Sequence, residues 1–116
     1  MKNTLILSGL TITLTVLTVE HQPALHVTVV AHDDGDTSDG TCHLRDATHL
    51  ADALESGTEG SWTITASSGT ASIEQHRYPE LDEPVFFTVT DGVGTGYPLS
   101  PQDRAHLARE LRALSA

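Results

Sequence analysis

The sequence contains the same nine-residue helical pattern twice. Residues 46–54 and 103–111 both follow D-x-x-H-L-A-x-x-L, and the second copy begins 57 residues after the first. The same offset places Asp34-Gly35 over Asp91-Gly92, and each pair ends a strand-like run that leads to its helix. A chain of 116 residues is close to two copies of such a unit. The repeat therefore predicts one unit that is duplicated and folded against itself.

The length of the chain predicts a single domain. Half of this chain is close to the lower limit for independent folding. We therefore expect one domain over residues 1–116 whose two repeats, 1–57 and 58–116, share a core. Hydrophobic residues make up 38% of the chain but aromatic residues only 4%. Leucine, valine, isoleucine and alanine must therefore supply most of the packing.

Runs of alternating polarity predict three strands in each half. In the first half a tight turn at Ser8-Gly9 joins the first two strands, since glycine tolerates positive φ. The expected strands cover residues 5–7, 10–19 and 25–31, then 62–66, 70–77 and 85–90. Two segments between strands and helices are expected to be loops, an exposed acidic one (33–40) and one rich in glycine (91–96).

Each half is expected to end in an amphipathic helix. The first helix starts with Asp46 as N-cap and ends before Gly57, a C-terminal glycine cap. The second is opened by S-P-Q-D, in which Ser100 is the N-cap and proline takes the first helical position. Apolar residues recur with helical spacing at Ala47, Leu50, Ala51, Leu54, Leu107, Ala108, Leu111 and Leu114. These patterns predict an α+β fold, an internally duplicated βββα unit with a pseudo-twofold axis and two helices packed on one face of antiparallel sheet.

The chain is strongly acidic. Sixteen Asp and Glu against six Lys and Arg give a formal net charge of −10, and the only lysine is Lys2. Phosphate backbones are bound by Lys and Arg, so this balance disfavours nucleic acid as a partner. It would steer the chain toward a basic protein surface. Adaptation to high salt, or a genome poor in lysine codons, explains the same acidity, and charge alone does not separate the three.

The cellular compartment is predicted from the cysteine count and the N-terminal segment. Cys42 is the single cysteine, so no disulfide can form within the chain, and this favours a reducing compartment. The apolar run over residues 5–19 is interrupted by threonines with period two, the pattern of a strand and not of a signal peptide or membrane helix. We therefore expect a cytoplasmic protein that does not interact with membranes.

The paired histidines of the two helices are the residues most suggestive of chemistry. His49 and His106 each follow an aspartate by three residues, Asp46 and Asp103, so imidazole and carboxylate share a helical face. If the two helix starts met, these four side chains would suit zinc or another divalent metal. The same spacing is also ordinary helix-start chemistry. We favour that second interpretation and keep the metal site as an alternative.

Three other motifs lack the pattern that their chemistry requires. The acidic loop has no glycine or glutamate at the positions an EF-hand needs. The glycine-rich loop matches no phosphate-binding motif and has no lysine nearby. Cys42 and His43 are adjacent, so in a strand they point to opposite faces and cannot act together as nucleophile and base. We therefore expect no catalytic residues and no cofactor.

The favoured hypothesis is a small, acidic, non-catalytic protein-interaction module that binds its partner through a sheet face or an edge strand. Roles as an inhibitor, an immunity protein, an anti-defence protein or a chaperone-like adaptor all fit it. The candidate interaction residues come from the acidic loop and the C-terminal helix: Asp33, Asp34, Asp36, Asp39, Arg104, Arg109 and Arg112. The alternatives are a metal-binding protein or metalloenzyme, and a structural homo-oligomer such as a homodimer that pairs edge strands.

Overall fold

The computed structural model describes residues 2–33, 35, 37–44, 46–66, 69–90 and 93–115. For residues 38, 46, 62–66, 69–71, 90 and 115 it describes the backbone alone. The first half of the described chain forms β1 (Lys2–Leu7), β2 (Leu10–Val19), β3 (Gln22–Ala31), β4 (Thr37–His43) and α1 (Asp46–Ser56). The second half forms β5 (Gly60–Ala66), β6 (Gly69–His76), β7 (Val85–Thr90), β8 (Val93–Tyr97) and α2 (Pro101–Ser115).

The elements follow one another as four strands and a helix, twice. This confirms the α+β class, but the expectation of three strands in each half is wrong. The additional strands, β4 and β8, lie in the segments expected to be acidic and glycine-rich loops. β4 pairs with β3, and β8 pairs with β7. Aspartate and glycine are depleted in strands, so only pairing with a neighbouring strand, and not local pattern, explains why these segments are extended.

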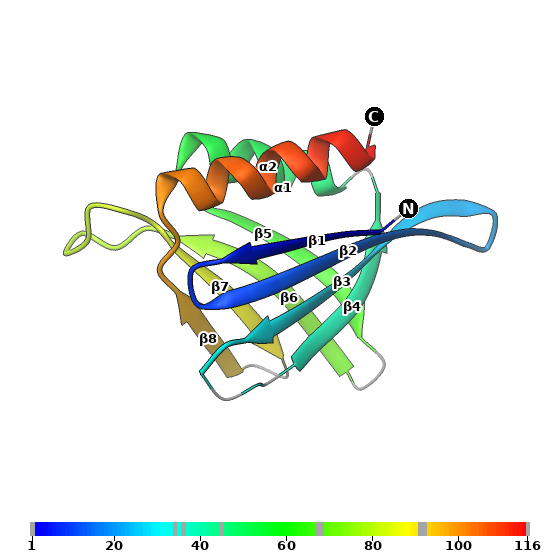
Figure 1. Cartoon of the computed structure of the whole chain (residues 1–116), viewed down its shortest axis with the longest axis horizontal. Helices are drawn as coiled ribbons and strands as arrows, with labels where there is room; N and C mark the ends of the chain where they lie inside the picture. Colours follow the sequence, from blue (N-terminus) through cyan, green and yellow to red (C-terminus); the bar gives the residue numbers. More distant parts are fainter. Residues whose placement is uncertain are drawn as a thin grey trace.

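All strands pair with their neighbours in sequence and run antiparallel, in the order β1 to β8. The two groups of four strands are joined between β4 and β5, where Thr41 pairs with Thr65. Figure 1 shows that the sheet curves so that β1–β4 face β5–β8, and that both helices lie across the same opening. Strands β1 and β8 are the two ends of the sheet.

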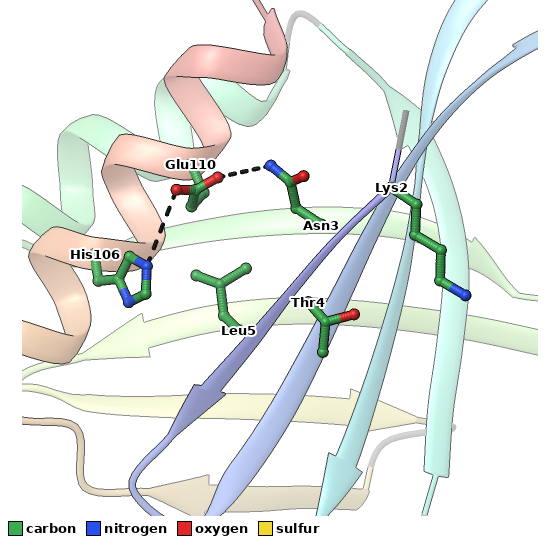
Figure 2. A pocket seen from close by; sticks show the side chains of 6 residues that line it. All are labelled: Lys2, Asn3, Thr4, Leu5, His106 and Glu110. Atoms are coloured by element: carbon green, nitrogen blue, oxygen red, sulfur yellow. Dashed lines mark hydrogen bonds and ion pairs between the residues drawn. The ribbon is translucent and has the colours of Figure 1, made fainter.

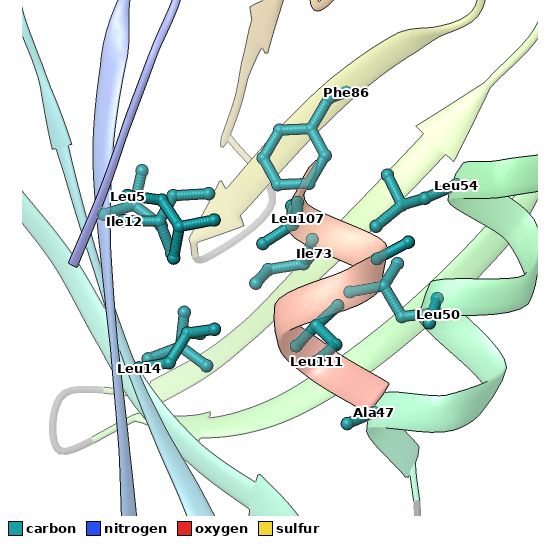
Figure 3. Close-up of a cluster of buried hydrophobic side chains, with 14 of the residues drawn as sticks. Leu5, Ile12, Leu14, Ala47, Leu50, Leu54, Ile73, Phe86, Leu107 and Leu111 are labelled. Carbon is teal, nitrogen blue, oxygen red and sulfur yellow. The ribbon is translucent and has the colours of Figure 1, made fainter. Parts of the chain in front are cut away.

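The interior receives side chains from both halves. The apolar stripes of the two helices are buried as expected, and they pack with leucines and isoleucines of β1, β2 and β6 and with Phe86. Figure 3 shows these side chains pointing into one common core. Among the described residues, no helix is long and apolar enough to cross a membrane.

The local signals read from the sequence are present at the turns and helix ends. Gly9 has a φ of 84° in the β1–β2 turn, and Gly57 has a φ of 68° directly after α1. The hydroxyl of Ser100 accepts a hydrogen bond from the backbone N–H of Asp103 at 3.1 Å, which is the expected N-cap of α2. The β2–β3 hairpin is longer than expected, because Pro23 remains in the strand and pairs with Thr18.

Side chains from other elements complete the C-terminal end of α1. Arg104 of α2, a predicted interaction residue, is instead only 7% exposed, and its Nη1 donates to the carbonyl of Leu54 at 3.1 Å. The amide of Gln75 donates to the carbonyls of Ala53 and Thr58, and Arg77 donates to the carbonyl of Gly57, each at 2.7 Å. Helix ends leave carbonyls without intrahelical partners, so these donors lock α1 to β6 and to α2.

Candidate functional site

The outer face of the sheet is the face turned away from the helices and the core. Three apolar residues of β7 lie on it, Val85, Phe87 and Val89, and all three are half-buried. The residues between them, Phe86 and Thr88, are buried against the core, since successive side chains of a strand point to opposite faces. An antiparallel sheet with one solvated face normally alternates apolar and polar residues. β7 departs from that rule by presenting apolar side chains outward.

Phe87 lies over two glycines of the neighbouring strand. The register pairs Phe87 with Gly96 and Val89 with Gly94. A Cβ atom on Gly96 would lie 2.9 Å from Cε1 of Phe87, so the ring occupies the space that a side chain would need. A Cβ on Gly94 would lie 3.6 Å from Cγ2 of Val89, which is ordinary contact. Strand β8 therefore leaves the apolar side chains of β7 uncovered on its side.

Two further rings extend this surface. His76 and Phe87 have centroids 5.7 Å apart at 61°, and Tyr78 and Phe87 have centroids 6.3 Å apart at 63°. Both are edge-to-face arrangements of the kind aromatic pairs prefer. Tyr78 is 39% exposed. We call the set His76, Tyr78, Val85, Phe87 and Val89 the aromatic patch.

A charged group borders the aromatic patch on β6. The hydroxyl of Ser72 donates to Oε2 of Glu74 at 2.6 Å, and Nε2 of His76 lies 2.6 Å from Oε1 of the same carboxylate. The hydrogen bond from Ser72, and then that from His76, lowers the pKa of Glu74 below its usual value of 4.5. Glu74 is therefore held in its negative form beside the rings.

The β6–β7 connection adds more negative charge at the end of the patch. Figure 1 shows this connection projecting from one end of the molecule, and the β2–β3 hairpin projecting from the other. Leu81 in the connection is 50% exposed, and Glu80, Asp82 and Glu83 around it are exposed as well. Of these carboxylates, Glu83 pairs with Arg104. The apolar surface thus has an acidic rim.

The outer face of the first half carries threonines and one histidine–aspartate pair. Nδ1 of His26 lies 3.1 Å from the hydroxyl of Thr41, and its Nε2 lies 3.5 Å from Oδ2 of Asp39. Thr41, His26 and Asp39 thus lie in the order of a nucleophile, a base and an acid. However, β3 lies between two paired strands, so the backbone N–H groups around His26 point to those strands. In the described part of this face, the backbone N–H groups around His26 are thus turned away from the position where an oxyanion would need donors.

The residues of the alternative metal site are distributed over different surroundings. Figure 1 shows that α1 and α2 run in opposite directions, so the two helix starts lie at opposite ends of the pair. His49 is exposed on α1, whereas Asp103 accepts a hydrogen bond from the backbone N–H of Ser8 at 3.2 Å. The side chain of Asp46 lies outside the described part of the chain. Among the side chains that are described, no three His, Cys, Asp or Glu lie together as a metal site would need.

His106 faces β1 and not α1. Its Nε2 lies 4.0 Å from Oε1 of Glu110, and Nδ2 of Asn3 donates to Oε2 of that carboxylate at 2.7 Å. Figure 2 shows Glu110 between the other two side chains. They line a polar hollow of about 300 Å³ together with Lys2, Thr4 and Leu5. This arrangement fastens α2 along the free edge of β1.

The predicted interaction residues do not share one surface. Asp33 and Asp39 are exposed, at the end of β3 and on β4, while Asp34 and Asp36 lie outside the described residues. Arg104 is buried at the end of α1. Arg112 pairs with Asp52 and Glu55 and so joins the two helices. Arg109 is exposed on α2.

The aromatic patch was not among the residues singled out from the sequence. The signal for it is the segment V-F-F-T-V-T, in which apolar residues occupy every second position on one face and Phe86 the other. A second signal is V-G-T-G-Y, where two glycines recur with the same period of two. These signals became informative only once the two segments were known to pair.

Comparisons with known proteins leave the family of this chain open. No protein-family model matches it, and no curated protein matches its sequence.

Proposed function

We propose that this chain is a non-catalytic protein-interaction module that binds its partner through the aromatic patch. The observation that carries the proposal is the set of apolar and aromatic side chains on the solvent face of β7 and the connection before it, including Phe87 and Tyr78. Apolar and aromatic side chains that gather on one patch of a protein surface often mark a binding site. Aromatic residues, moreover, contribute strongly to the energy of protein interfaces.

The proposed partner is a basic protein. A formal net charge of −10 and the acidic rim of the patch favour it, because complementary charge speeds encounter and selects between partners. The same charge disfavours nucleic acid. We place the protein in the cytoplasm, where inhibitor, immunity, anti-defence and chaperone-like adaptor roles are all consistent with such binding.

We further propose that the two halves are copies of one ancestral unit related by a pseudo-twofold axis. The repeated pattern D-x-x-H-L-A-x-x-L and the repeated order of four strands and a helix support this view. On this hypothesis the outer faces of the two halves have diverged, one keeping threonines and the other acquiring the aromatic patch.

Site-directed photo-crosslinking tests the proposed surface. The photoreactive residue benzoylphenylalanine is placed at Tyr78 or Leu81 in the full chain, expressed in its source cells, and crosslinked proteins are identified by mass spectrometry. We expect one and the same partner from both positions. Matched controls carry the residue at Thr4 or Ile6, which are exposed on the outer face of β1, and should not capture that partner.

Binding of the purified partner provides the quantitative test. Phe87→Ala should weaken binding about tenfold or more, as expected for an aromatic interface residue, and Ile6→Ala should leave it unchanged. Added salt should weaken binding by the wild-type chain, because charges are screened. Crosslinking that is equally efficient from β1, or an effect of Ile6→Ala as large as that of Phe87→Ala, would refute the assignment of the patch.

A further inference from the structure

The two edge strands of the sheet, β1 and β8, differ in how far other elements cover them. At β1, Asn3 binds Glu110 of α2, and the turn that follows β1 donates from Ser8 to Asp103 of the same helix. Side chains of α2 thus guard that end. At the other end, residues 93–96 of β8 are exposed and Val93 is 72% exposed. An unguarded edge strand is a ready template for pairing with another chain.

Strand β8 lacks the charged residues and prolines that commonly protect sheet edges. Its five residues, V-G-T-G-Y, include no charged residue and no proline, the residues most often used for this purpose. Two of the five are glycines, which have no side chains to cover the backbone. Beside the strand lies a hollow of about 370 Å³ between residues 95–98 and the first half of the chain, where Ser8, Gly9, Ala31 and Asp33 border it.

The register identifies which backbone groups of β8 point outward. Thr90 pairs with Val93 across a two-residue connection. Such a closing pair is hydrogen bonded, and bonded and non-bonded pairs alternate along an antiparallel ladder. The backbone groups of Val93, Thr95 and Tyr97 therefore point to β7. Those of Gly94 and Gly96 point to the free side.

We infer that an extended segment of the partner adds to β8 as a further strand of the sheet. Its backbone pairs with Gly94 and Gly96, the mode known as strand addition. Side chains at every second position of that segment would then lie beside the glycines, against Phe87 and Val89 on the outer face, and they should be apolar. This inference rests on the proposed function, since it specifies how the partner reaches the aromatic patch.

Charge decides what kind of segment occupies this edge. A second copy of the chain would bring two molecules of net charge −10 together edge to edge, and like charges oppose this. Asp33 borders the hollow beside β8, and Glu74 borders the patch. The segment that fits alternates apolar residues on the outer face with basic residues on the other.

An NMR experiment on the ¹⁵N-labelled full chain tests this inference. The probe is a nine-residue peptide of alternating valine and lysine, and the control is the same peptide with N-methyl groups on alternate backbone nitrogens. Binding of the probe should slow hydrogen exchange at the amides of Gly94 and Gly96 by about tenfold, as expected when an exposed amide becomes hydrogen bonded. Exchange on the free edge of β1 should not change, and the N-methylated peptide should give no protection.

Two variants of one residue separate backbone pairing from side-chain contact. Gly94→Pro removes an outward N–H, which an edge strand tolerates in the free protein, and it should abolish the protection at Gly96. Gly94→Ala keeps the N–H, and its methyl group meets Val89 and Phe87 at 3.6 and 3.7 Å, so protection should persist. The amide spectrum of each free variant shows whether it is folded.

The outcomes distinguish this inference from the proposed function. If the probe perturbs Phe87 and Val89 without protecting the glycines, strand addition is wrong and the patch stands. If it perturbs neither, both fail for this class of partner. If Gly94 and Gly96 are already protected in the free protein, more so at higher concentration, a second copy occupies the edge and the inference is overturned.

Discussion

At the scale of single residues, Glu74 shows how the outer face controls its own charge. Ser72 and His76, each two residues away on the same strand, contact its two carboxylate oxygens at 2.6 Å. These contacts lower the pKa of Glu74, with the hydrogen bond from Ser72 as the largest cause. A group whose pKa is lower in the folded state stabilises the fold above its unfolded pKa. That contribution is lost as the pH falls through the folded value.

Ser72→Ala should therefore raise the pKa of Glu74. The measurement is an NMR titration of the side-chain carboxyl of Glu74 in the folded protein. The stability lost in the variant, measured by urea unfolding, should be largest near neutral pH and should shrink as the pH falls through the lowered folded-state pKa of Glu74, because only below that value is the carboxyl protonated in both states. Thr28→Ala, on the outer face of β3, is the matched control and should leave the pKa of Glu74 unchanged. An unchanged pKa in Ser72→Ala would contradict the assigned cause.

At the scale of elements, α1 is completed by side chains that belong to other elements. The carbonyls of Ala53 and Leu54 accept hydrogen bonds from Gln75 and Arg104, and the carbonyl directly after the helix, that of Gly57, accepts one from Arg77. Cationic donors are favourable at this end, because the helix dipole makes it negative. The helix is therefore stabilised as part of the assembled fold more than by its own short sequence.

Arg104→Met should destabilise the fold by about 2 kcal/mol, because it leaves the buried carbonyl of Leu54 without its donor. Urea unfolding followed by circular dichroism measures the change. Arg112→Met is the matched control on the same helix, since Arg112 forms its ion pairs with Asp52 and Glu55 at the surface. Such pairs contribute about 1 kcal/mol or less. Equal losses in the two variants would show that the α1 end is not the more important contact.

The β2–β3 hairpin contains a second element-scale constraint. Glu20 and His21 at its tip have φ values of 51° and 65°, a conformation that side chains other than glycine and asparagine rarely adopt. Two consecutive positive φ values are typical of a type I′ turn, for which asparagine followed by glycine is preferred.

Replacing the pair by the preferred residues, Glu20→Asn with His21→Gly, should stabilise the protein by about 1 kcal/mol. Thermal unfolding measures the gain. The converse change, Gly9→Ala in the β1–β2 turn, should destabilise it, because Gly9 has a φ of 84° with no atom within 4 Å of an added Cβ. The loss of stability in Gly9→Ala would therefore come from backbone strain and not from a steric clash. A loss of stability in the double variant would show that the tip side chains make contacts that outweigh the strain.

At the scale of the whole molecule, the sequence predicted what short-range rules control. The caps at Ser100 and Gly57, the turn at Gly9 and the buried helical stripes are all set by residues within a few positions of one another. Prediction from the sequence failed where the structure of a segment depends on residues far away in the chain. β4 is polar and β8 is glycine-rich, and each is a strand only because β3 or β7 lies beside it.

The candidate site was missed for the same reason. Phe87 on an outer strand face looks like a core residue until Gly94 and Gly96 are known to lie opposite. Arg104 lies off the apolar stripe of its helix, and only the position of α1 explains its burial. Helical spacing marked His49 and His106 as equivalent, but the opposite directions of the two helices give them different surroundings.

The hydrogen-bond donors at the end of α1 have a consequence for the order in which the chain can fold during its synthesis. Every strand pairs with its neighbour in sequence, so β1 to β4 can assemble while the ribosome is still making the second half. The α1 helix is made next, and the carbonyl of Ala53 finds a local donor in the backbone N–H of Thr58, but the carbonyl of Gly57 receives its side-chain donor from Arg77 and that of Leu54 only from Arg104. We therefore expect the first half to stay incompletely folded until α2 is made, because α2 both covers the core and supplies the donor for a helix some fifty residues earlier in the chain.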